Sequence, residues 1–105
     1  MEAISVDEGV PTVLSCPRCG FDYLHQGRIT AWQRRQEDAH GVEVVIDGTQ
    51  VADCAKAAAA MPGRRDTLSI AFVCEGCGDG LTLWMQQHKG QTHVWWNVES
   101  TTEGT

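Results

Sequence analysis

"CPRCG" at residues 16–20 and "CEGCG" at residues 74–78 carry two cysteine pairs with the same spacing, each followed by glycine. Two intervening residues let a tight turn direct both sulfurs at one ion, and tetrahedral zinc takes four thiolates at about 2.3 Å. The glycine can adopt a positive φ, which lets backbone N–H groups point at the sulfurs. We therefore predict one four-cysteine metal site, formed by Cys16, Cys19, Cys74 and Cys77.

Local disulfides or a redox-active C-x-x-C pair are the alternatives. A thioredoxin-like pair begins a helix in a βαβ unit, whereas the second pair here ends one strand and leads into another. The N-terminus lacks the pattern of a secretory signal, and no apolar stretch is long enough to span a bilayer, so we expect a cytoplasmic location with reduced thiols. Two matched pairs then favour metal. Zinc is the expected cofactor, with iron, as in rubredoxin, the alternative.

A shell of four thiolates leaves no position for water or substrate, which predicts a structural site whose binding free energy supports folding. The site stays negative, and Arg18 or Arg28 is its expected cationic support. The sequence shows no nucleophile–base set and no phosphate loop. Nor do the histidines share metal-ligand spacing: His25, His40, His88 and His93. We therefore expect a protein that is not an enzyme, with no catalytic residues.

The rest of the chain is mostly strand-like. Residues 28–33 alternate weakly, residues 42–46 are β-branched, and residues 68–74 place apolar side chains on one face. Residues 53–63 read as a two-turn helix or a mobile loop. These patterns predict a mostly β fold: a small antiparallel zinc-ribbon β domain with five or six strands and at most one short helix. It forms a single domain over residues 1–105, with an ordered core at about 12–98 and flexible polar ends.

Residues 81–88 and 91–98 flank Lys89-Gly90 and predict a hairpin. A two-residue turn places Trp84 opposite Trp95 and Gln86 opposite His93, on the more polar face, although a glycine bulge would shift this register. Either a neighbouring segment such as residues 51–61 covers the two indoles, or they form an interaction site with Gln86 and His93. Cys54 reads as a small, semi-buried apolar residue.

Two C-x-x-C-G knuckles joined to hairpins resemble the zinc-ribbon or rubredoxin-like class. More narrowly, "FVCEGCG" (72–78) followed by "QHKGQTHVWW" (87–96) resembles small zinc-ribbon proteins of actinobacteria and their phages. In that group a C-P-x-C-G knuckle precedes a strand and an R-R-D turn, here residues 64–66, leads into the second knuckle. The resemblance covers roughly residues 14–97 and implies a phage or bacterial accessory protein, with no particular reaction.

The formal net charge is −6, and four thiolates holding one divalent ion would bring it to −8. That negative charge disfavours electrostatic binding to the phosphates of DNA or RNA. The leading hypothesis is a structural-zinc protein-interaction module that binds a host protein, in the host cytoplasm if phage-encoded, or a copy of itself. An alternative is a nucleic-acid-binding or transcription-associated zinc ribbon; a redox protein with iron or an enzyme subunit is a third. Residues 42–46 could pair with their own copy as an open edge strand in a homodimer.

Overall fold

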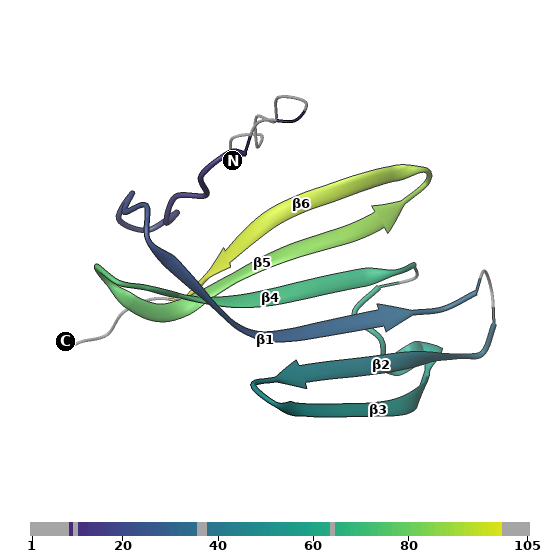
Figure 1. Cartoon of the computed structure of the whole chain (residues 1–105). Coiled ribbons are helices and arrows are strands. Elements are labelled where there is room, and N and C mark those ends of the chain that lie inside the picture. Colours follow the sequence, from purple (N-terminus) through teal and green to yellow (C-terminus); the bar gives the residue numbers. More distant parts are fainter. Residues whose placement is uncertain (1–8, 10, 36–37, 64, 100–105) are drawn as a thin grey trace.

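The computed structural model describes residues 9, 11–35, 38–63 and 65–99. Six strands form one antiparallel sheet in the order β3-β2-β1-β4-β5-β6 (Figure 1). This confirms the predicted mostly β, antiparallel fold. The elements are β1 (Leu24–Gln33), β2 (His40–Asp47), β3 (Gln50–Ala57), a 3-10 turn η1 (Ala58–Ala60), β4 (Thr67–Cys74), β5 (Gly78–His88) and β6 (Gln91–Val98).

The sheet consists of two three-stranded meanders that meet where β1 pairs with β4. In the second meander, the β5–β6 turn places Lys89 at φ 51° and Gly90 at φ 82°. Positive φ at both turn residues matches the twist of a two-residue hairpin. The predicted register is therefore confirmed: Trp84 lies opposite Trp95, and Gln86 lies opposite His93.

Two predictions about the first meander are wrong, at least in part. The expected helix or mobile loop at residues 53–63 is wrong for its first part, because residues 53–57 complete β3 and pair with β2. Only η1 is helical. Residues 42–46 are not an open edge, because β2 is paired on both sides; the edge strands are β3 and β6.

The two faces of the sheet differ in chemistry. Cross-strand register aligns side chains in rows, because paired residues of antiparallel strands point to the same side. The aliphatic face, as we call it, carries a row that crosses all six strands: Val51, Ile46, Ile29, Ile70, Leu83 and Trp96. The tryptophan face, on the opposite side, carries the row Ala52, Val45, Thr30, Ser69, Trp84 and Trp95.

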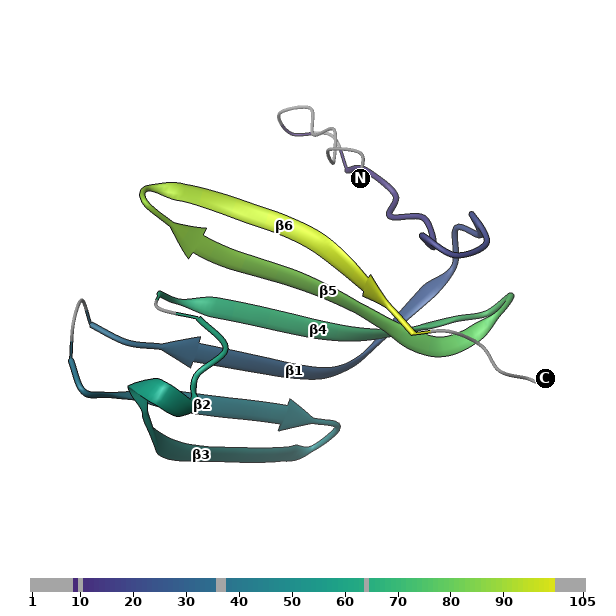
Figure 2. The same cartoon turned by 180° about the vertical axis from the view of Figure 1, so that it is seen from behind.

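The connection from β3 to β4 crosses the tryptophan face. Figure 2 shows η1 and the chain after it passing in front of β2 and β1. Met61 lies against Gly41 of β2. A Cβ atom added to Gly41 would lie 3.0 Å from the sulfur of Met61. Gly63 lies against the Gln86 side chain of β5. The segment therefore covers the end of the tryptophan face that is farthest from the cysteines.

The sheet buries few side chains completely. The buried apolar residues are Cys16, Cys74, Leu81 and Leu83. The extensive contacts between elements all join neighbouring strands, so the described residues form one layer rather than two. Within those residues no helix is long and apolar enough to cross a membrane.

Candidate metal centre

The pairing of β1 with β4 brings the two cysteine pairs together. Cys16 and Cys19 lie in the turn region before β1, whereas Cys74 ends β4 and Cys77 directly precedes β5. Because Leu24 at the start of β1 pairs with Cys74, the first knuckle lies over the β4–β5 turn. All four Sγ atoms lie within 4.8 Å of one another. The structure thus gathers the four predicted cysteines at one end of the sheet.

The sulfur geometry fits a shared ion better than disulfides. The Sγ atoms of Cys16 and Cys77 are 3.6 Å apart, as are those of Cys19 and Cys74. Both pairs join one knuckle to the other, and all four thiols are free. A disulfide needs about 2.05 Å between sulfurs, whereas a tetrahedral shell with bonds of about 2.3 Å places them about 3.8 Å apart. The four residues can therefore hold a metal ion.

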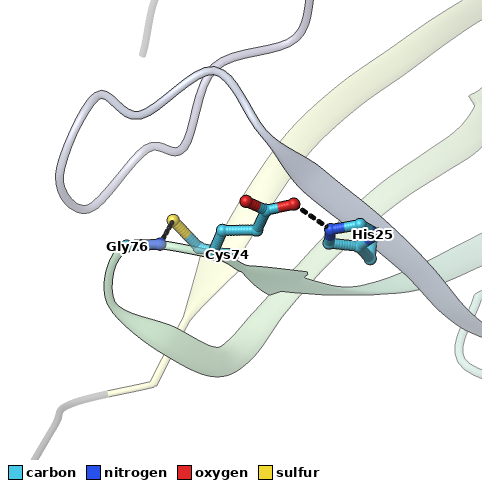
Figure 3. Close-up of polar contacts among 4 residues, drawn as sticks. His25, Cys74 and Gly76 are labelled. Atoms are coloured by element: carbon cyan, nitrogen blue, oxygen red, sulfur yellow. Dashed lines mark hydrogen bonds and ion pairs between the residues drawn. The ribbon is translucent and has the colours of Figure 1, made fainter.

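Backbone N–H groups surround the two buried sulfurs. The N–H groups of Arg18 and Cys19 point at the Cys16 Sγ at 3.3 and 3.4 Å. That of Gly76 points at the Cys74 Sγ at 3.3 Å (Figure 3). Gly20 and Gly78, which follow the knuckles, have φ of 83° and 98°, a conformation that costs a side-chain-bearing residue energy. Each glycine thus allows its knuckle to close.

Arg18 is the cationic support of the site. Its Nε donates to the Cys77 Sγ at 3.2 Å. Its guanidinium also donates to four backbone carbonyls, at 2.6 to 3.3 Å, which belong to Cys77, Gly78, Asp79 and Glu99. Arg28, the other candidate, instead pairs with Asp47. Arg18 therefore ties the first knuckle to the second and to the end of β6, and the prediction for Arg28 is wrong.

The thiols of the first knuckle have different acidities. Burial raises the pKa of Cys16, but the N–H groups of Cys19 and Arg18 outweigh it and lower this pKa to about 6. The N–H of Phe21 lowers the pKa of Cys19, but burial and hydrogen bonds to neighbouring thiols together raise it to about 12. The hydrogen bond to Cys77 and the nearby thiolates raise the pKa of Arg18. One thiolate is therefore stabilised before any metal binds.

The site is continuous with the small apolar core. Cys16 and Cys74, 3% and 2% exposed, form a cluster with Leu81, and Trp96 packs against it. The outer side is more open, since Cys19 is exposed. There the His25 ring contacts the carboxylate of Glu75, which lies within the second knuckle (Figure 3). A bound ion would therefore stabilise the core and the end of the sheet together.

The paired tryptophans belong to a larger group that the sequence did not reveal. Trp32 of β1 stacks on Trp84 at 5.8 Å between ring centroids, and Trp84 stacks on Trp95 at 6.1 Å. We call these three residues the tryptophan ladder. They are only partly buried, and beneath them β4 contributes the buried Thr67 and Ser69. Trp84 therefore stacks on both of the other indoles.

Other predictions at this face are only partly right. Of the predicted cover, residues 51–61, the first part is wrong, because residues 51–57 form β3 at the opposite edge of the sheet from β6. The second part crosses the tryptophan face (Figure 2), where Met61 lies against Gly41 of β2. The Gln86 amide donates to Thr67, which holds it within the sheet. His93 contacts Gln91 and the ring of His88 near the β5–β6 turn.

Cys54 is exposed rather than semi-buried. It lies on β3, and its Sγ is 3.8 Å from the Glu43 carboxylate, outside the four-cysteine cluster. The prediction of a semi-buried residue is therefore wrong.

Basic residues gather at the end of the sheet opposite the cysteines. Arg34 follows β1, Arg65 precedes β4 and Lys89 lies in the β5–β6 turn, and these three line one pocket with Asp66. The antiparallel order brings these points together although they are distant in the sequence. The sequence places Arg34 beside Arg35 and Arg64 beside Arg65, but the proximity of Arg34 and Arg65 to Lys89 depends on the topology.

Fold and site define a class: a single six-stranded antiparallel sheet with a four-cysteine cluster, able to hold a metal ion, at one end. Comparison of the chain with models of protein families, with curated proteins and with solved structures finds no match. The resemblance to zinc-ribbon proteins of actinobacteria and their phages therefore stays a prediction.

Proposed function

We propose that this chain is a protein-interaction module that a structural zinc ion stabilises, with no catalytic role of its own. Four thiolates are the donor set that structural zinc sites use, and they fill a tetrahedral shell. In this proposal Cys16, Cys19, Cys74 and Cys77 bind the zinc. The metal content of the purified protein tests its identity: one zinc per chain supports the proposal, whereas visible absorption from iron contradicts it.

The tryptophan ladder is the observation that favours a protein partner. Aromatic side chains surrounded by polar groups are typical anchors of protein interfaces. Asn97 and His93 on β6 supply exposed polar groups beside Trp95. In this proposal the partner is a host protein, if the chain is an accessory protein of a phage as the resemblance implies.

Quantitative affinity purification from an extract of the native host tests this function. Trp95→Leu removes the outermost ring of the ladder yet leaves an apolar group against Trp84. We expect this variant to keep its metal and its cooperative melt, but to lose most of the partner that the wild type retains. Val94→Ala, at the next position on the opposite face, is the control. Equal recovery with Trp95→Leu, or no partner with the wild type, contradicts the proposal.

Nucleic-acid binding is a second candidate, favoured by the pocket that Arg34, Arg65 and Lys89 line. Cations from three segments could contact successive phosphates. The net charge of −6 and the mutual stacking of the indoles oppose it. Titration of labelled single- and double-stranded DNA at low and physiological salt is decisive. Binding that weakens with salt and with Lys89→Glu, but not with Lys56→Glu on β3, supports this candidate; no binding at low salt eliminates it.

A further inference from the structure

The aliphatic face is open away from the cysteines, whereas at the cysteine end Cys16 of the first knuckle packs with Leu81 and Trp96 of this face. In Figure 1 the start of β1 crosses in front of β4 and β5 at that end, and no described segment passes in front of the rest of the face. On the opposite face, η1 and the chain after it cross β2 and β1 in Figure 2. Several valine and isoleucine side chains of the aliphatic face are exposed by 40% or more: Val42 (46%), Ile46 (40%) and Val51 (70%). Domains normally bury the apolar face of a sheet against a second layer. A continuous apolar surface of this kind marks an interface.

We propose that the aliphatic faces of two copies pack on each other and form a two-layered homodimer. Each copy then supplies the second layer that the other lacks, and the same rows of side chains meet around a two-fold axis. Aligned sheets of this kind pack about 10 Å apart with their strands rotated by about 30°. The tryptophan faces remain on the outside, so this interface is separate from the proposed partner surface.

The distribution of charge allows the chain to pair with itself despite its net charge of −6. Among the paired strand positions, the ionisable side chains on the aliphatic face are Asp53, His40 and Cys74. Asp53 and His40 lie toward the β3 edge, and Cys74 lies at the cysteine end of β4. The centre of the interface is therefore free of charged groups, as the core of an interface normally is.

The two ends of the sheet indicate how the copies are oriented. Acidic residues outnumber basic ones at the cysteine end, where Asp22, Glu75, Asp79 and Glu99 lie with Arg18. Basic residues outnumber acidic ones at the other end, where Arg34, Arg35, Arg65 and Lys89 lie with Asp38 and Asp66. If the strands of the two copies run in opposite directions, the acidic end of each copy lies over the basic end of its partner. This arrangement is the electrostatically favoured one.

The mass of the metal-loaded, full-length protein in solution, measured by light scattering or sedimentation, tests the proposal. We expect the wild type to have twice the 11.5 kDa mass of one chain. Val42→Lys combined with Ile46→Lys places two charges on the aliphatic face and should halve that mass. Ala52→Lys combined with Cys54→Lys, at exposed positions on the other face, adds the same charge and should leave it unchanged. A monomeric wild type, or a dimer that survives the first pair of substitutions, overturns the proposal.

Two methionines of the wild type give a second measurement that needs no variant. Met85 lies on the aliphatic face and Met61 lies over the tryptophan face, and both are partly buried in the single chain. Oxidation of Met85 by peroxide should slow severalfold as the protein concentration rises through the dimerisation range, while oxidation of Met61 should not change. An oxidation rate of Met85 that is the same at concentrations at which the mass shows a monomer and at those at which it shows a dimer would place the interface elsewhere and overturn the proposal.

Discussion

At the scale of the residue, Arg18 connects three segments. Its five hydrogen bonds reach one sulfur and four carbonyls. Support of this kind orients metal ligands, and its loss typically costs about 10- to 100-fold in metal affinity.

We predict that Arg18→Ala weakens metal binding by roughly one to two orders of magnitude. Arg18→Lys should recover only part of the affinity, because an ammonium cannot reproduce the planar fork of donors. Competition with a chromophoric chelator measures both. Arg28→Ala is the control, since Arg28 forms an exposed pair with Asp47 far from the sulfurs, and equal effects of the two alanine variants would contradict the assignment.

The lowered pKa of Cys16 favours metal binding at neutral pH, whereas the raised pKa of Cys19 opposes it. The pKa of Cys16 is lowered to about 6 from an ordinary value of 9.0. A thiol whose pKa is lowered in the folded state stabilises the fold fully at a pH above its ordinary pKa. This stabilisation is lost as the pH falls through the lowered pKa. We therefore expect release during acidification near or below pH 6, followed with a metal indicator. Release that is half complete near pH 8 would contradict this.

At the scale of the element, the β5–β6 turn contains a strained residue. Lys89 has φ 51°. This left-handed conformation costs about 1 kcal/mol for residues other than glycine, asparagine or aspartate. We predict that Lys89→Asn raises the free energy of unfolding by up to about 1 kcal/mol, because Asn-Gly is the preferred pair for this turn. Gly90→Ala should lower it. Thermal melts of the metal-loaded protein measure both, and a lower melting temperature for Lys89→Asn would contradict the turn assignment.

Strand β3 is the weakest element of the sheet. It pairs only with β2, and its side chains are mostly small and exposed. We predict that its amides exchange with solvent much faster than those of β4, which is paired on both sides. Hydrogen exchange followed by mass spectrometry resolves the two strands. Equal protection in β3 and β4 would show that a partner covers the β3 edge.

The elements also show what sequence patterns can and cannot predict. The register of β5 and β6 was predictable because apolar and polar residues alternate on both sides of Lys89-Gly90. Strand β3 was missed because alanines such as Ala55 and Ala57 favour helix locally, whereas backbone pairing with β2 decides the outcome. The contact of Trp32 with Trp84 depends on the order of strands, which no local pattern encodes. For the same reason the cysteine cluster was predictable from its spacing, but the choice between Arg18 and Arg28 was not.

At the scale of the whole molecule, a metal ion would hold the central pair of strands together. The cysteines join the start of β1 to the end of β4, and few other buried side chains are available. Structural zinc contributes on the order of 10 kcal/mol or more to small domains, which exceeds the net stability of most of them.

We predict that chelation, or Cys74→Ser, abolishes the cooperative thermal transition. Cys54→Ser should leave it unchanged, because Cys54 lies outside the cluster on β3. Circular dichroism and calorimetry measure the transition. An unchanged melt after complete removal of metal would contradict both the structural role of the ion and the proposed function.

The chain enters and leaves the sheet at the same place. The first knuckle precedes β1, and Glu99 follows β6 and accepts a hydrogen bond from Arg18 at its carbonyl. Lys89 lies in the β5–β6 turn at the opposite end of the sheet. The cationic end is therefore formed by connections between strands alone, distant from the points where the chain enters and leaves the sheet.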